Sequence, residues 1–248
     1  MKINKHLGKQ YTGGDINVDI TRAAKLCQGN DNLCLWTISK DGNVYIPYIF
    51  KANFDKQQQR VIIASLMQFN ILTCIRFIHR TNQDEYLEFT NGDGCWSYIG
   101  PRKGKPQEIS LSASGCVHVG IIQHEVMHAL GFHHEHTRND RDKYIDIIIN
   151  NIEPGSYGNF KIKPSNNLGA PYDYGSIMHY GRYVFSKGHG FPTILPKPNR
   201  TVPIGQIRGL SELDIIKINR LYNCSSLAVQ IFSCSRILRL HSFTCKDL

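Results

Sequence analysis

The pattern of apolar and polar residues predicts a first half built from short strands and one long helix. Residues 44–50, VYIPYIF, are typical of a strand that contains a proline. Apolar side chains recur at helical spacing through residues 56–74, which predicts an amphipathic helix. Residues 75–80 and 85–90 predict two further strands, and the turn-rich residues 91–112 leave room for one or two short ones.

The second half is predicted to contain two helices separated by irregular chain. Residues 120–132, GIIQHEVMHALGF, predict a helix that Gly131 ends. Residues 150–175 are rich in Asn, Gly, Pro and Tyr, which indicates long loops. Residues 211–222 predict a last helix with Ser211 as its N-cap. We therefore expect a sheet-bearing first half and an irregular second half, with a histidine-rich helix between them.

The composition is that of an ordinary globular protein with a basic surface. The 248 residues suit one large domain or two small lobes, and the net charge is +9. Lys and Arg are spread along the chain without interleaved aromatic runs, which argues against nucleic-acid binding. The charge indicates either a solvated basic surface or attraction to acidic substrates. We expect no transmembrane segment, and the N-terminal MKINKHLGKQ lacks the apolar stretch of a signal peptide.

Eight dispersed cysteines indicate an oxidising compartment. None forms a Cys-x-x-Cys pair, which argues against a zinc ribbon or a thioredoxin-type site. An even number suits disulfides, although spacing cannot choose among the possible pairings. Two glycosylation sequons, Asn199-Arg200-Thr201 and Asn223-Cys224-Ser225, agree weakly with secretion.

The stretch HEVMHALGFHHEH, residues 124–136, has the spacing of a metal site. His124 and His128 are four residues apart, so a helix places both imidazoles on one face. Glu125 can reach a water bound to the metal. Gly131 permits a sharp turn, after which His134, and not its histidine neighbours, can close the site. Three imidazoles leave one zinc position open, as in catalytic sites. The competing interpretation is a surface helix that is merely rich in histidine.

The extended motif resembles the metzincin signature and, more specifically, the astacin family. The segments HEVMHALGFHHEHTRNDRD, SIMHY, GCWSYIG and GLSELDIIKINRLYNC match that family over about residues 11–224. The cysteine pair in KLCQGNDNLCLW is similar to that of the hatching-enzyme group. The resemblance implies an α+β, two-lobed catalytic domain with an active-site cleft between the lobes. The N-terminal lobe would hold helices and a twisted sheet with mostly antiparallel edges. The C-terminal lobe would be irregular and end in a long helix.

The resemblance also assigns roles to individual residues. His124, His128 and His134 would bind one zinc ion, and Glu125 would be the general base. Tyr180 would be a switchable zinc ligand that stabilises the oxyanion. Met178 would form an apolar floor beneath the zinc, and Glu135 would receive the amino group of the mature N-terminus. Both also have ordinary alternatives, a core methionine and a surface glutamate.

The segment YTGGD, residues 11–15, resembles the end of an astacin propeptide. Asp15 would then be a fourth zinc ligand in a latent precursor; the alternative is a Gly-Gly-Asp surface turn. Cleavage between Arg22 and Ala23 would activate the chain. The expected organisation is a propeptide end at 1–22, a catalytic domain at 23–224 and a tail of unknown role at 225–248.

These resemblances imply a secreted zinc endopeptidase. The hatching-enzyme resemblance implies egg-envelope protein as its substrate. Its partners would be a protein or peptide substrate and an activating protease, and we expect a monomer. A catalytically dead metal-binding module is the alternative, but no motif residue is lost. The family usually has Arg directly after IGQ, whereas this chain has Ile207, so a preference for acidic substrate residues is in doubt. Three disulfides are implied by the resemblance: Cys74–Cys224, Cys95–Cys116 and Cys27–Cys34; Cys234 and Cys245 are left unassigned.

Overall fold

A mixed seven-stranded sheet organises the first lobe of the computed structural model. The structure describes residues 11–12, 14–17, 35–51 and 54–225. The strand order is β1-β2-β6-β7-β5-β3-β4. In chain order the strands are β1 (Tyr11–Thr12), β2 (Ile16–Asn17), β3 (Val44–Phe50), β4 (Ile75–His79), β5 (Leu87–Thr90), β6 (Cys95–Ser97) and β7 (Gln107–Leu111).

Most of the pairings in this sheet are parallel. β3 pairs in parallel with both β4 and β5, β5 with β7, and β2 with β6. The β1–β2 and β6–β7 pairs are antiparallel. The expectation of antiparallel edges is therefore met at the β1 side alone, because β4 at the opposite edge follows its helix and runs parallel to β3. The short strands β1 and β2 were not predicted from the sequence, because their residues lack a strand-like pattern.

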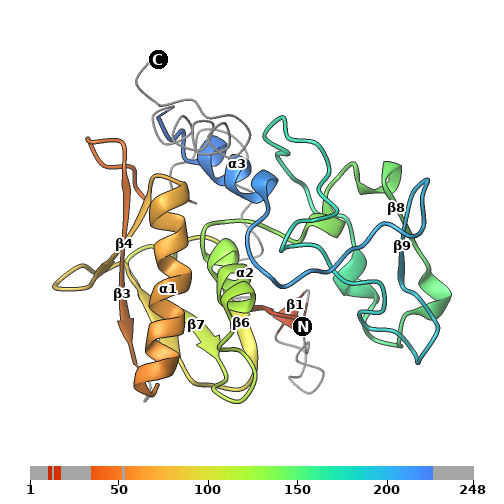
Figure 1. The fold of residues 1–248 in the computed structure, drawn as a ribbon, viewed down its shortest axis with the longest axis horizontal. Helices are drawn as coiled ribbons and strands as arrows, with labels where there is room; N and C mark the ends of the chain where they lie inside the picture. Colours follow the sequence, from red (N-terminus) through yellow and green to blue (C-terminus); the bar gives the residue numbers. More distant parts are fainter. Residues whose placement is uncertain (1–10, 13, 18–34, 52–53, 226–248) are drawn as a thin grey trace, which may run out of the picture.

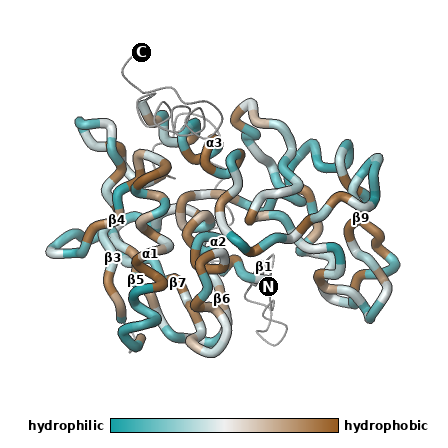
Figure 2. The backbone as a smooth tube through the Cα atoms, in the orientation of Figure 1, coloured by the Kyte–Doolittle hydropathy of each residue, from teal (hydrophilic) through white to brown (hydrophobic). Residues whose placement is uncertain are grey.

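Two helices lie side by side over one face of this sheet (Figure 1). Helix α1 (Lys56–Leu72) begins with a capping box formed by Asp55 and Gln58. Helix α2 (Val119–Ala129) is buried along nearly its whole length. Apolar residues recur along both helices (Figure 2), and their buried members belong to the larger core of the protein. Gly131 has a φ of +105° just beyond α2, as the predicted helix end requires.

The second lobe contains little regular structure. Its described elements are four 3-10 helices (Glu135–Thr137, Arg141–Lys143, Ile149–Asn151 and Tyr157–Phe160) and a two-stranded sheet of β8 (Ile145–Ile147) and β9 (Ile194–Pro196). A smaller core, separate from the first, stabilises this lobe. This arrangement matches the predicted irregular second half.

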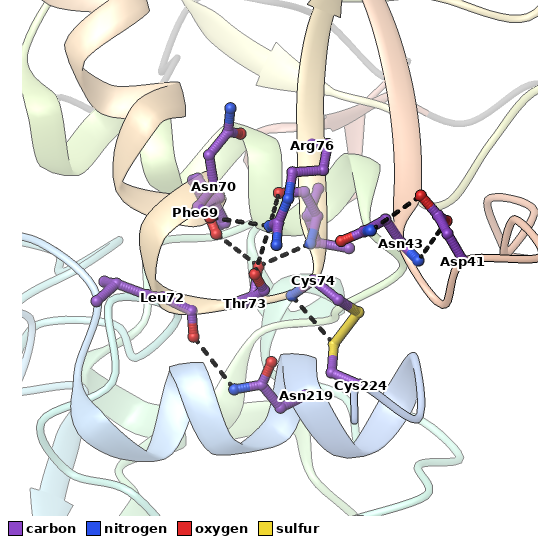
Figure 3. Close-up of a disulfide and its surroundings, with 11 residues drawn as sticks. Asp41, Asn43, Phe69, Asn70, Leu72, Thr73, Cys74, Arg76, Asn219 and Cys224 are labelled. Atoms are coloured by element: carbon purple, nitrogen blue, oxygen red, sulfur yellow. Dashed lines mark hydrogen bonds between the residues drawn. A yellow bond between two sulfur atoms is a disulfide. The ribbon is translucent and has the colours of Figure 1, made fainter. Parts of the chain in front are cut away.

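Helix α3 (Glu212–Leu221) returns the chain to the first lobe. Ser211 caps it, and the buried side chains of Ile218 and Tyr222 belong to the larger core. A disulfide joins Cys224 after α3 to Cys74 after α1 (Figure 3). A second joins Cys95 to Cys116. Both are pairings that the resemblance implies.

Several expectations concern residues outside the described part of the chain. These are the cleavage point at Arg22 and Ala23, the Cys27–Cys34 pair, and the tail with Cys234 and Cys245. Among the residues that the structure does describe, no helix combines the length and apolar character needed to cross a membrane.

Candidate metal centre

Three imidazoles converge at the end of α2. His124 and His128 project from one face of the helix, and their ring centroids lie 4.7 Å apart. The turn at Gly131 brings His134 back to them, with its Nε2 atom 3.3 Å from Nε2 of His124. All three side chains are buried. The structure therefore brings together the three histidines that the motif predicts.

Asp15 completes this cluster from the N-terminal segment. Its carboxylate oxygens lie 3.2 Å from Nε2 of His124, 3.6 Å from Nε2 of His128 and 3.2 Å from Nε2 of His134. Asp15 is fully buried, so it is not part of an exposed Gly-Gly-Asp turn. The four residues are the group within the described chain that could hold a metal ion.

The spacing of these ligand atoms suits zinc. In a tetrahedral site with zinc–ligand bonds of about 2.0–2.1 Å, neighbouring ligand atoms are about 3.4 Å apart. The distances of 3.2–3.6 Å around Asp15 and the 3.3 Å between two imidazoles agree with that geometry. Oδ1 of Asp15 and Nε2 of His128 are buried and have no hydrogen-bond partner, as expected of atoms that face a cation. The donor set of three imidazoles and one carboxylate therefore fits zinc.

Backbone carbonyls fix the orientation of two of the imidazoles. Nδ1 of His124 lies 2.8 Å from the Ile177 carbonyl oxygen, and Nδ1 of His128 lies 2.8 Å from that of Phe132. Each Nδ1–H donates to its carbonyl, which leaves Nε2 free of a proton and available to a metal. Burial lowers the pKa of His128 to about 3 despite the opposing effect of Asp15, so this imidazole is neutral.

Glu125 lies on α2 beside the cluster with both carboxylate oxygens buried and unpartnered. Burial, reinforced by the negative charge of Asp15, raises the pKa of Glu125 well above its usual value. An unpartnered buried carboxylate destabilises the fold, so its presence calls for a functional explanation. The structure therefore places close to Asp15 the glutamate that the resemblance names as general base.

The loop at residues 176–180 packs against the cluster. Met178 is buried in the larger core, and its carbonyl oxygen accepts a hydrogen bond from the backbone N–H of Glu135 at 2.9 Å. The ring of Tyr180 lies 4.6 Å from that of His134 and stacks at 3.9 Å on His136. Burial, followed by the charges of the two nearby carboxylates, raises the pKa of the Tyr180 phenol, which keeps it protonated.

Asp214 on α3 holds this loop, and sequence reasoning missed it. Its carboxylate accepts hydrogen bonds from the hydroxyl of Ser176 at 2.6 Å and the backbone N–H of Ile177 at 2.9 Å. It also accepts from the N–H of Ser211 in the capping box of α3. The sequence identified Ser211 as the cap of this helix, but nothing in it indicated that Asp214 holds the loop.

Glu135 is buried, and cations already surround it. Its carboxylate accepts hydrogen bonds from Nζ of Lys217 at 2.7 Å, from the guanidinium of Arg138 at 3.0 Å and from the N–H of Asp173 at 2.9 Å. It is therefore not an ordinary surface glutamate. Sequence reasoning missed Lys217, because its position on α3 gives no sign of the distant carboxylate. The expected partner, the amino group of Ala23, lies outside the described residues.

Comparisons with known proteins agree on one family. The family model for Astacin, a peptidase family, matches residues 35–223. The chain is 45% identical over 226 residues to an astacin-like metalloendopeptidase of Coturnix japonica, covering 91% of this chain and 54% of the relative. It is 46% identical over 221 residues to high choriolytic enzyme 2 of Oryzias latipes, covering 89% of this chain and 78% of that protein.

A solved structure extends the similarity to the fold. High choriolytic enzyme 1, a hatching enzyme zinc-protease from Oryzias latipes, superimposes with a TM-score of 0.77 at 47% identity, covering 79% of this chain and 97% of that one. The chain spans about half the length of its astacin-like metalloendopeptidase relatives and about four fifths of the choriolytic enzymes. With the motif, the fold and the family model in agreement, the chain belongs to the astacin family of peptidases.

Proposed function

We propose that this chain is a secreted, zinc-dependent endopeptidase that is made as a latent precursor. The observation that carries the proposal is the buried cluster of Asp15 and three imidazoles at zinc-like spacing, with the unpartnered carboxylate of Glu125 beside it. A purely structural zinc site would have no use for that second, unpaired carboxylate.

The residues of the site can supply metal binding, proton transfer and oxyanion stabilisation for peptide hydrolysis. Zinc, when bound, supplies a Lewis acid that polarises the scissile carbonyl and activates water. His124, His128 and His134 hold it, and their buried position excludes bulk solvent. Glu125 accepts the proton of the attacking water and passes it to the leaving amine. The protonated phenol of Tyr180 donates a hydrogen bond to the developing oxyanion, an interaction worth about 3 kcal/mol in such sites.

The N-terminal segment accounts for latency. Asp15 would occupy the fourth ligand position that a catalytic water needs. The N–H of Ser97 on β6 donates a hydrogen bond to the Asp15 carbonyl oxygen at 3.0 Å. Ile16 is buried against a small pocket that includes His134 and Asn159. The segment therefore fills the space beside the ligands where a substrate backbone would lie.

Cleavage after Arg22 would release this block. The segment 1–22 would separate from the catalytic domain of 23–224, and the ammonium group of Ala23 would become a third cation at Glu135. That carboxylate adjoins ligand His134, and the N–H of Glu135 donates a hydrogen bond to the loop of Met178. The new N-terminus would thus act on the site through these neighbours.

The substrate is a protein, and the relatives suggest which kind. Two of the similar proteins are choriolytic enzymes, and the solved relative is described as a hatching enzyme. We infer an extracellular structural protein of the egg-envelope type as the substrate class. Two disulfides in the described chain support an oxidising, extracellular setting.

The test compares zinc content and casein cleavage before and after limited trypsin treatment, with the cut at Arg22 verified by mass. One zinc per chain, with activity only in the cleaved sample, is the expected result. Glu125→Gln should bind zinc but not cleave casein, while the exposed control Asp93→Asn should behave as the parent. Full activity of Glu125→Gln, or a chain that binds no zinc, would overturn the proposal.

A further inference from the structure

A four-residue turn in the second lobe displays one of the two sequons. Residues 198–201 are all exposed, between β9 and α3. The chain is anchored on either side of this turn. The backbone N–H of Lys197 donates to the carbonyl oxygen of Tyr144 at 2.7 Å, and the guanidinium of Arg182 donates to that of Val202 at 3.2 Å. Hydrogen bonds therefore fix the chain on both sides of the exposed turn.

Of the two polar atoms in the Asn199 side chain, only Oδ1 forms hydrogen bonds within the described chain. Its Oδ1 atom accepts hydrogen bonds from the backbone N–H of Thr201 at 2.9 Å and from the Thr201 hydroxyl at 2.7 Å. Its Nδ2 atom has no hydrogen bond within the described chain, and the residue is exposed. This is the Asx-turn conformation, in which Oδ1 faces its own backbone and Nδ2 faces solvent.

We propose that Asn199 is a site of N-linked glycosylation. The donor is a lipid-linked oligosaccharide diphosphate in the secretory pathway. The bond between its anomeric carbon and the diphosphate oxygen breaks, a bond from that carbon to Nδ2 of Asn199 forms, and one amide proton passes to a base of the transferase. The diphosphate leaves with the lipid. The exposed turn accommodates the bulky sugar after folding without displacing any contact of the core.

The second sequon differs in its surroundings. Asn223 follows α3 in the left-handed conformation, with a φ of 48°, and the central residue Cys224 is tied to Cys74. Within residues 223–225 no hydrogen bond joins Ser225 to the Asn223 side chain, in contrast to the Thr201–Asn199 contact. Cys224 must also reach a partner 150 residues earlier in the chain. The structure therefore favours Asn199 over Asn223.

The test is translation of the full chain, with a leader sequence added, in the presence of microsomes, followed by peptide:N-glycosidase digestion and peptide mapping. The enzyme converts a glycan-carrying asparagine to aspartate, so the modified position is read directly whether or not a variant folds. Asn199→Gln and Thr201→Ala should each lose the glycan. Arg200→Lys, Thr201→Ser and Asn223→Gln should keep it.

The result shows whether Asn199 is glycosylated, and it does not depend on peptidase activity. Conversion of Asn199 to aspartate in the parent chain, lost with Thr201→Ala, supports the proposal. An unmodified Asn199 peptide in imported chain overturns it, whether or not Asn223 carries a glycan.

Discussion

Asp214 links the stability of the protein to its metal centre, and its replacement by alanine tests that link. The side chain is 1% exposed and accepts three hydrogen bonds. Asp214→Ala leaves the buried O–H of Ser176 and the buried N–H of Ile177 without an acceptor. Each unsatisfied group costs about 1–3 kcal/mol. The half-buried N–H of Ser211 adds about 0.5 kcal/mol, because water reaches it more easily.

One term opposes this loss. Burial raises the pKa of Asp214 in spite of its hydrogen bonds to Ser176, Ile177 and Ser211, so keeping its charge buried has a cost that alanine removes. We therefore expect a net loss of about 3 kcal/mol in the free energy of unfolding, a large share of the roughly 5–15 kcal/mol of a typical domain. Asp214→Asn retains one acceptor and should lose less.

The loop that Asp214 holds also orients a metal ligand, because the Ile177 carbonyl accepts a hydrogen bond from Nδ1 of His124. Loss of such outer contacts weakens metal binding by about 10–100-fold. Urea unfolding followed by tryptophan fluorescence measures the first effect, and zinc competition with a chromogenic chelator measures the second. Glu212→Ala, at an exposed position in the first turn of the same helix, is the control and should cost less than about 1 kcal/mol. A loss below about 1 kcal/mol for Asp214→Ala, with unchanged zinc affinity, would refute the reasoning.

Three further predictions concern latency, metal and cross-linking. Asp15→Ala should give partial casein cleavage by uncut chain, because the fourth ligand position opens and the N-terminal segment loses its contact with the imidazoles. An uncut variant as inactive as the uncut parent would argue against Asp15 as the cause of latency. Removing zinc with a chelator should lower the melting temperature, and restoring zinc at about 1,000 times its dissociation constant should return about 4 kcal/mol; a melting curve indifferent to metal would contradict a zinc site. Replacing both Cys74 and Cys224 by alanine should cost up to about 5 kcal/mol in urea unfolding, since their bond closes a loop of sequence separation 150. A loss near zero would indicate that the disulfide does not restrict the unfolded chain.

Local sequence was sufficient for the elements and for most of the candidate site. Helical spacing, together with Gly131 and the Ser211 cap, predicted the ends of α1, α2 and α3. All but one of these ends lie within one or two residues of the observed position. The same local geometry places His124 above His128 on one helix face, and Gly131 has the positive φ that its position requires. Such inferences succeed because each depends on residues less than about three turns apart, where backbone geometry alone sets the distances.

The parallel order of the sheet, by contrast, was not readable from the strands. β3 pairs with β4 and β5 in the same direction because the intervening connections cross over the sheet, as α1 does between β3 and β4. A strand's own pattern of apolar residues does not say which neighbour it pairs with.

The sequence by itself thus determined the helices, the histidine ligands and the family resemblance. Tertiary structure decided which distant charges meet them, although the family resemblance had already indicated Asp15. Asp15 reaches His124 across 109 residues, Lys217 reaches Glu135 across 82, and Asp214 reaches Ser176 across 38. A buried polar group cannot hydrogen-bond to water, so it pairs with whichever polar groups the fold places beside it. The periodicity of apolar residues does not predict these partners, because it describes one helix or strand at a time.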